Sequence, residues 1–331
     1  MKGIKKYLVY GSMAMVLSVG SVACTEEELG KRAEIGYVEI ALDWGNNRPS
    51  GKQFFFYPVD GGEVLVYGSD APECNAEGVD GFSGMLPTGS YQMIVTNTDG
   101  VNLEFRNMNR YETAEVGVKR VNASRVMQQE SLANRIEQAG SLFFANCFSD
   151  ASDSDPLTLV VPYQATVKKR ANPSGYVKKV RLYFRIERPE SIAGCSGVFT
   201  GVSESIRCAS ERCSATSASI DFVASKSQST SGNRADFVAG FSVLDLLDPE
   251  SALSGVHVVY LTLTKTDGTR SETSIDVTGA VQEVIDGQGG VIPFDIPLEV
   301  ELKTLEDGTL GADVRPWTEG TGSGTVTGSV N

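Results

Sequence analysis

The sequence predicts an all-β protein. Glycine is frequent, with 35 residues in a chain of 331, and apolar residues with helical spacing are scarce. Short runs that alternate apolar and polar residues recur between turn-forming residues, which is typical of half-buried strands. Since a domain takes roughly 100–200 residues, the length predicts about two domains.

The clearest strand of the first half lies at residues 37–44, where four apolar residues alternate with polar ones. This pattern predicts one buried face and places Trp44 in the core. Proline and glycine pre-set the turn Leu86-Pro87-Thr88-Gly89. Further strands are expected at residues 54–58, 63–67, 92–97 and 103–105, the first two joined as a hairpin by Asp60-Gly61-Gly62.

A break in the strand pattern separates the two halves. Residues 122–145 keep only partial helical spacing and predict a loop with about two helical turns. The acidic and small residues 149–155 predict a linker. A calcium loop is disfavoured there, because the bending glycine and the distal glutamate of an EF-hand are missing.

Strand signals resume beyond the linker. Residues 180–186 show the cleanest period of two in the chain. Asp267-Gly268 and Asp307-Gly308 are hairpin signals, and the glycine, serine and threonine content of residues 320–331 predicts a flexible tail. The expected strands are residues 157–167, 180–186, 256–264, 271–277, 298–302 and 310–314.

Residues 1–23 have the composition of an export signal. Lys2, Lys5 and Lys6 make its start positive, and residues 7–23 carry no charge. A membrane-spanning helix needs about 20 consecutive, predominantly apolar residues, so the glycine- and serine-containing run favours a signal peptide over an uncleaved transmembrane anchor.

The segment Ser21-Val22-Ala23-Cys24 resembles the lipobox of bacterial lipoproteins, although Ser21 stands where leucine is usual. The resemblance implies that Cys24 is acylated and attaches the protein to outer-membrane lipid. Two or three acyl chains contribute about 0.8 kcal/mol per buried methylene, enough to hold the chain without a spanning helix.

Three acidic residues, Glu26, Glu27 and Glu28, follow the cysteine. They resemble the sorting signal that sends Bacteroidetes lipoproteins to the outside of the outer membrane. A merely solvated tether over residues 24–35 explains them equally well.

The charge balance excludes nucleic acid as a partner. The formal net charge is −13, and removal of residues 1–23 takes away three lysines and no acidic residue, which lowers it to −16. Such a surface repels phosphate backbones and anionic headgroups.

No residue pattern predicts catalysis, a metal site or a cofactor. A nucleophile activated by histidine would depend on the single histidine, His257, which lies in an alternating strand and is expected to be structural or solvated. The segment from Gly45 to Lys52 is one residue too long for a phosphate loop, and strands rather than a helix follow it.

Five cysteines remain after Cys24, so at least one must be free or pair between chains. Cys195, Cys208 and Cys213 lie close together in the sequence, and an oxidising compartment would allow one disulfide among them. Zinc would need a fourth ligand at tight spacing, which the sequence does not offer.

Several segments carry a family resemblance: "GYVEIALDWG", "FFFYPVDGG", "LPTGSYQMIVTNTDG", "LEFRNMNRYETA" and the terminal "DVRPW". Together they resemble the fimbrillin-like lipoproteins of Bacteroidetes, which include pilus anchor and accessory subunits of the type V group. The resemblance implies two tandem transthyretin-like Greek-key β-sandwiches, at residues 36–154 and 155–319.

The resemblance also implies a role in fimbrial assembly and cell adhesion through β-strand addition to other fimbrial subunits. In polymerising members an arginine-specific protease cuts after the first strand, where this chain has Arg48. The tail, residues 320–331, offers only two apolar residues as a donor strand. We therefore favour an anchor or accessory role.

Two other functional classes stay open. A glycan-binding surface lipoprotein would expose aromatic side chains to a host or glycan surface, and Trp44 and Trp317 are the two tryptophans. A structural surface coat is the third class.

Overall fold

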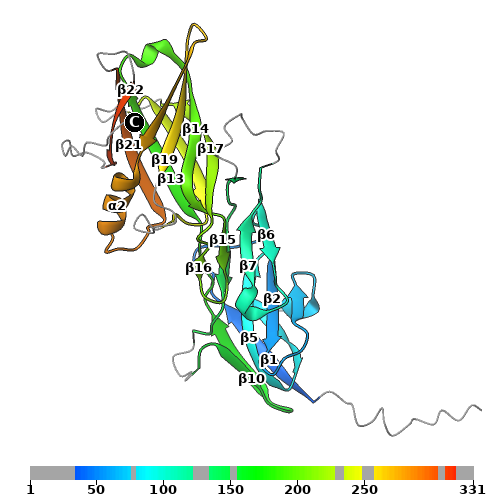
Figure 1. Cartoon of the computed structure of the whole chain (residues 1–331). Coiled ribbons are helices and arrows are strands. Elements are labelled where there is room, and N and C mark those ends of the chain that lie inside the picture. The colour runs from blue at the N-terminus through cyan, green and yellow to red at the C-terminus, as the bar shows by residue number, and fades with distance from the viewer. Residues whose placement is uncertain are drawn as a thin grey trace, which may run out of the picture. The chain divides into compact units, whose positions relative to one another are not determined.

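The computed structural model describes residues 34–75, 80–121, 134–149, 155–227, 235–247, 257–304 and 310–317. These residues form four β-sheets and one α-helix, α2 (Thr278–Asp286) (Figure 1). Short 3₁₀ turns lie at Pro72–Cys74, Tyr111–Thr113 and Pro189–Ser191. The prediction of an all-β protein is confirmed.

A three-stranded sheet contains the first strand of the described chain. In this sheet β1 (Ile35–Leu42) lies between β4 (Gly81–Pro87), which runs antiparallel to it, and β11 (Thr166–Ala171), which runs parallel. The strand forms because its apolar residues alternate, and Val38, Ile40 and Leu42 are all buried.

A six-stranded sheet packs against the buried face of the three-stranded sheet. Its order is β12 (Ser174–Gly175), β9 (Phe143–Ala145), β5 (Gly89–Asn97), β2 (Lys52–Pro58) and β3 (Leu65–Gly68), with β10 (Thr158–Val161) also paired to β5.

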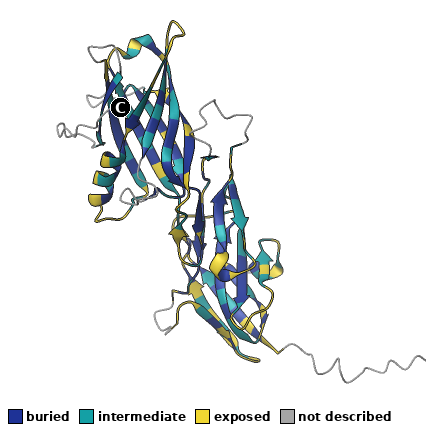
Figure 2. Ribbon diagram, in the orientation of Figure 1, coloured by how far each residue is buried: buried dark blue, intermediate teal, exposed yellow. Residues whose placement is uncertain are grey.

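The core between these two sheets is rich in aromatic side chains. The rings of Phe56 and Phe82 meet edge to face with centroids 5.0 Å apart, and Phe54 stacks beside Phe56. Trp44 is 6% exposed and contacts Phe143 edge to face, which confirms its predicted place in the core. Figure 2 shows the buried residues as stripes along these strands.

The opposite face of the six-stranded sheet belongs to a second core. Phe55, Tyr57 and Ile94 alternate with the residues of the first core and pack with Val116 and Ile206. The last two come from a four-stranded sheet of β16 (Arg212–Cys213), β15 (Ser205–Arg207), β7 (Glu115–Val118) and β6 (Leu103–Arg106).

The fourth sheet has nine strands and supplies most of the second core with its apolar face. Its order is β20 (Arg270–Asp276), β19 (Val258–Lys265), β14 (Ile192–Ser203), β17 (Ser217–Lys226), β18 (Phe237–Val243), β13 (Lys178–Ile186), β21 (Asp295–Thr304) and β22 (Leu310–Pro316), with β8 (Arg135–Ile136) beside β17. The helix α2 contacts β21 and β22.

Most predicted strands are confirmed, and so is the hairpin of β2 with β3. The second hairpin, β19 with β20, is confirmed as well. Strands β4, β7, β14, β17 and β18 were missed, and so were the short strands β8, β9, β12, β15 and β16. The single strand predicted at residues 157–167 is wrong, because Pro162 and the residues after it break the run into β10 and β11. Residues 134–145 hold β8 and β9 and no helical turn; residues 122–133 lie outside the described part.

The predicted boundary between residues 154 and 155 does not separate the sheets. Strands β10, β11 and β12 pair with β5, β1 and β9, and β15 pairs with β7. The second core is a single cluster of buried side chains that includes residues of both halves, from Phe55 to Val314. The described residues from Ile35 onward form one compact unit. The alternation of apolar and polar residues shows which face of a strand is buried, but not which strand lies beside it. The sequence could therefore not show that strands from beyond residue 154 pair with strands before it.

Candidate assembly surface

The central position of β1 makes it the first candidate site. Six of its residues pair with β11 and seven pair with β4. A β-carbon on Gly81 would overlap the carbonyl oxygen of Ile40, so β4 approaches β1 closely only because residue 81 is glycine. Removal of β1 would leave two open sheet edges and an apolar groove lined by the first core.

Arg48 lies exposed in the loop between β1 and β2, as predicted, and Pro49 follows it directly. The loop is attached at Ser50, whose backbone N–H and hydroxyl both donate to Asp99 at 2.7 and 3.0 Å. Partial burial opposes ionisation of Asp99, but these hydrogen bonds and one from Asn97 lower its pKa. Arg48 also lines a cavity of about 260 Å³ beside the ion pair of Lys52 and Asp80.

Sheet edges are the second candidate for strand addition. In the described part of the chain, β3 and β12 end the main path of the six-stranded sheet, and β20 and β22 end that of the nine-stranded sheet. Edge strands offer unpaired N–H and C=O groups to another chain.

A larger cavity of about 850 Å³ lies beside the end of β2. Gln92, Asn109, Arg110 and Glu112 supply polar groups to its wall, and Tyr57 and Tyr111 meet at a centroid distance of 5.6 Å. The Tyr57 hydroxyl is buried and has no hydrogen-bond partner among the described residues. Burial raises the pKa of Tyr57, so this hydroxyl stays a neutral donor.

His257 is structural, one of the two roles expected for it. It lies directly before β19 with 2% exposure, and its Nε2 is 3.0 Å from the carbonyl oxygen of Leu247. Burial lowers the pKa of His257. No group of three or more His, Cys, Asp or Glu side chains could hold a metal ion within the described ranges.

The disulfide predicted among Cys195, Cys208 and Cys213 is absent, because each thiol is free in the structure. Cys195 lies within β14 between β17 and β19, whereas Cys213 belongs to β16 and its thiol donates to Asp245 at 3.4 Å. Nearness in sequence therefore did not bring the sulfurs together. Burial raises the pKa of Cys195 and of Cys208 to about 12.

The remaining predicted residues lie outside the described part: Cys24, Glu26, Glu27, Glu28, the tether up to residue 33, residues 150–154 of the linker and the tail at residues 320–331. No helix of the described segments is long and apolar enough to cross a membrane.

Two side-chain arrangements, one polar and one aromatic, were not predicted from the sequence. Glu204, between β14 and β15, is 6% exposed and accepts hydrogen bonds from Arg106, Arg120 and Asn134 at 3.2–3.3 Å. Tyr183 and Trp317 stack at a centroid distance of 4.3 Å. No local pattern marks these side chains, because their partners come from distant strands.

The chain is similar to solved proteins from Bacteroides and Porphyromonas, and it shares its fold with the two whose TM-scores are 0.50 or more. A "putative adhesin" from Bacteroides ovatus is 22% identical with a TM-score of 0.59, over 86% of this chain and 94% of that one. A Bacteroides thetaiotaomicron structure described among "putative polysaccharide binding proteins" is 11% identical with a TM-score of 0.50, over 86% and 98%. The fimbrial anchor protein Mfa2 from Porphyromonas gingivalis is 13% identical with a TM-score of 0.49, over 88% and 98%.

No curated protein matches the sequence. A family model does match, over residues 23–223, and its description is a domain of unknown function, DUF5119. This match covers more than half of the chain. The protein therefore belongs to the DUF5119 family.

Proposed function

We propose that the protein is a lipid-anchored surface subunit that acts in fimbrial assembly and cell adhesion, in the role of an anchor or accessory subunit. The observation that carries this proposal is the position of β1 between β4 and β11. The shared fold with a "putative adhesin" is consistent with it.

The position of β1 connects the anchor to the fold. The expected acylation site, Cys24, stands ten residues before Glu34, and β1 begins at Ile35. A cut after β1 would separate the acylated segment from the rest of the chain and would open the groove at the same time. A subunit that must stay on the membrane therefore has to keep β1, with Val38, Ile40 and Leu42 in the core.

The sequence around Arg48 favours retention of β1. The bond after Arg48 leads into Pro49, whose ring nitrogen has no N–H and whose ring restricts the preceding residue. A protease that cuts after arginine binds such a bond poorly. This supports the anchor role over that of a polymerising shaft subunit.

The test is metabolic labelling of Cys24 with an alkyne palmitate analogue in cells, with protease added to intact cells in parallel. The expected result is a labelled chain that is digested from outside and copurifies with a fimbrial polymer. The variant Cys24→Ser should lose the label. An unlabelled wild-type chain in the soluble fraction would refute the proposal.

A second prediction concerns processing. Replacement Pro49→Ala should make the bond after Arg48 accessible to an arginine-specific protease, because the exposed loop then presents an ordinary secondary amide. Mass spectrometry would show a cut after residue 48 in this variant and none in the native chain. The double replacement of Arg48 and Pro49 by alanine is the control and should stay intact.

Glycan binding is a second candidate function. The cavity beside β2 is lined by the amide and charged groups of Gln92, Asn109, Arg110 and Glu112, which are groups that hydrogen bond sugar hydroxyls. Calorimetry against a panel of host and bacterial polysaccharides tests this function, and binding that is lost in Gln92→Ala would support it. Flat isotherms across the panel would remove it.

A further inference from the structure

Exposed apolar side chains gather around the β4–β5 turn, residues 87–89. Six of them form what we call the apolar ring: Ile35, Tyr37, Val59, Met85, Val160 and Tyr163. Met85, Tyr163 and Val160 are 61%, 56% and 57% exposed. Large apolar side chains this open at one end of a protein mark a contact surface.

Pairing between strands places these residues together. Ile35 lies opposite Pro87, and Tyr37 lies opposite Met85, in the pair of β1 with β4. Val160 lies opposite Ser90 in the pair of β10 with β5, and the N–H of Val59 donates to the carbonyl oxygen of Ser90 at 2.8 Å.

Tyr163 joins the ring through its neighbour. The N–H of Gln164 donates to the carbonyl oxygen of Ile35 at 3.0 Å, and the Gln164 side chain donates to the Tyr163 hydroxyl at 2.9 Å. Ile35, Tyr37 and Met85 belong to the outer face of the three-stranded sheet, whereas Val160 belongs to the outer face of the six-stranded sheet. The ring thus covers both faces around the turn.

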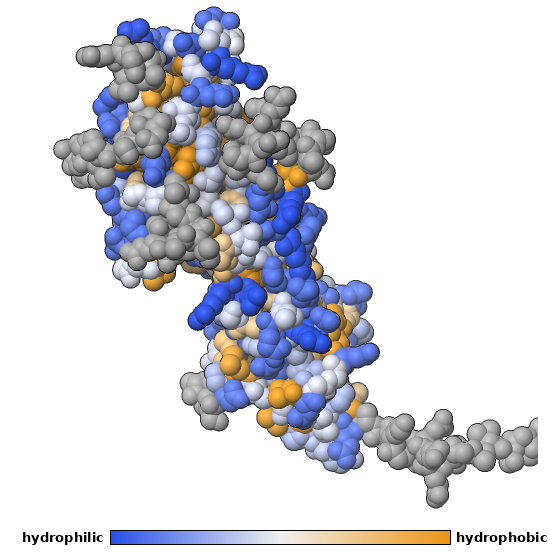
Figure 3. Space-filling view, viewed as in Figure 1, coloured by the Kyte–Doolittle hydropathy of each residue, from blue (hydrophilic) through white to orange (hydrophobic). Residues whose placement is uncertain are grey.

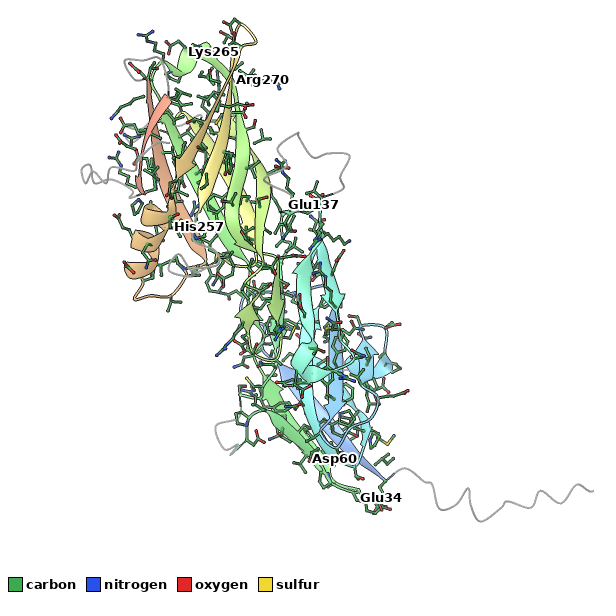
Figure 4. The ribbon with its side chains drawn as sticks, in the orientation of Figure 1. Glu34, Asp60, Glu137, His257, Lys265 and Arg270 are labelled. Atoms are coloured by element: carbon green, nitrogen blue, oxygen red, sulfur yellow. The ribbon has the colours of Figure 1, made fainter. Side chains whose placement is uncertain are left out.

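Figure 4 labels Glu34 and Asp60 at this same end of the ribbon, and Figure 3 shows apolar side chains at the surface there. The residues between the ring members, Thr88, Ser90 and Gln164, are polar but uncharged. Glu34 and Asp60, the chain neighbours of Ile35 and Val59, are the acidic residues at this end. Tyrosines among aliphatic side chains match the chemistry of the bilayer interface, where tyrosine is enriched.

We infer that the apolar ring contacts the lipid bilayer that holds Cys24. This inference rests on the proposed acylation of Cys24. Eleven peptide steps join Cys24 to Ile35, so the tether spans at most about 40 Å and the ring is the surface of the protein nearest the anchor along the chain. The acyl chains supply the affinity, and the ring fixes which end of the protein meets the membrane.

The test compares two tryptophan probes in the full mature chain, purified from membranes and reconstituted into vesicles of phosphatidylethanolamine and phosphatidylcholine. One probe is Met85→Trp, in the ring. The matched control probe is Val223→Trp. Val223 lies in β17, is 79% exposed and is far in sequence from the ring.

Brominated lipids quench tryptophan only at short range. The fluorescence of the unsubstituted chain, which contains Trp44 and Trp317, is subtracted from that of each variant. We expect the remaining fluorescence of the Met85→Trp chain to fall about twofold in brominated vesicles, and that of the Val223→Trp chain to stay unchanged. Adding Tyr163→Ser and Val160→Ser to the Met85→Trp chain should reduce the quenching. Equal quenching at both probes, or none at residue 85, would overturn the inference.

Flotation of the vesicles separates this outcome from failure of the proposed function. A chain that does not float with vesicles is not acylated, which contradicts the proposed function itself. A chain that floats but shows no quenching at residue 85 contradicts the ring alone. A third outcome is that neither probe is quenched by the lipid, but a purified fimbrial subunit changes the fluorescence of the tryptophan at residue 85. This outcome would assign the ring to a protein partner, which also overturns the inference.

Discussion

Glu204 shows how one buried side chain joins separate segments of the fold. Arg106 is the last residue of β6, Arg120 follows β7 and Asn134 precedes β8, and all three donate to its carboxylate. Burial opposes ionisation, but the hydrogen bonds from Arg120, Asn134 and Arg106 prevail and lower the pKa of Glu204. The carboxylate therefore stabilises the fold in its charged form.

The variant Glu204→Gln should lower the free energy of unfolding by about 1–3 kcal/mol at neutral pH, because two arginines lose their shared charge partner. The pKa of Glu204 is lowered in the folded state, so its contribution is complete above the unfolded pKa of about 4.3 and is lost as the pH falls through the lowered value. Urea unfolding at several pH values measures both effects.

Glu104→Gln is the matched control, since Glu104 also pairs with Arg106 but its side chain is 44% exposed. The expected change is under about 1 kcal/mol. Equal losses in the two variants would contradict the role given to burial.

Gly201 and His257 are a second case at the residue scale. Gly201 has a φ of +77°, and a β-carbon there would overlap Nδ1 of the buried His257 ring. Gly201→Ala should therefore lower the free energy of unfolding by about 2 kcal/mol or more, because the backbone is left-handed there and the added methyl group displaces the ring.

Gly268 gives the comparison, because its φ is +86° and the space around its would-be β-carbon is open. Gly268→Ala should cost only the backbone part, about 1 kcal/mol. Thermal unfolding of both variants provides the measurement, and a larger loss at residue 268 would show that the packing at His257 is not the deciding contact.

At the scale of elements, β1 depends on a close approach that only glycine allows. Gly81 faces the carbonyl oxygen of Ile40 across the pair of β1 with β4. The pairing on the other side, with β11, begins more than 120 residues later in the chain, so β1 is held by one local and one distant neighbour.

Gly81→Ala should weaken the pairing of β1 with β4 and lower the free energy of unfolding by about 1–3 kcal/mol, since the added methyl group displaces a backbone carbonyl. In the Gly81→Ala variant, backbone amide hydrogens should exchange faster in residues 35–42 than in β19. The control is Gly240→Ala, another strand glycine, where the nearest atom would lie at an ordinary 3.8 Å. A similar loss at residue 240 would contradict the argument.

At the scale of the whole molecule, strands from beyond residue 154 complete the core of the first half. Leu159, Val161 and Ala171 are buried with Ile40 and Phe82 in the first core. A chain that ends at residue 154 would leave that core open along β10 and β11, and would leave β7 without β15.

Such a truncated chain should not unfold cooperatively, because much of its apolar surface would stay in contact with water. Circular dichroism during heating, compared with the full chain, checks this. A sharp, monomeric unfolding transition of residues 24–154 would show that the first half folds by itself.

Strand positions could be predicted to a large extent, because the two-residue period depends only on neighbouring side chains. The segments around Val38, Leu182 and Leu261 all had this period, and all are strands. Strand β14 was missed because its outer face carries glycine, serine and alanine rather than a regular polar series. The proposed anchor residue Cys24 also came from the sequence, through a local motif.

The sequence by itself determined the all-β class, the faces of most strands and the burial of Trp44, since these follow from residues close together in the chain. Tertiary structure decided that β1 lies between β4 and β11, that Glu204 is surrounded by arginines and that the exposed apolar side chains meet at one turn. The physical reason is that strand pairing joins residues as far apart as Tyr37 and Thr166, and the choice among many such partners depends on packing of the whole core.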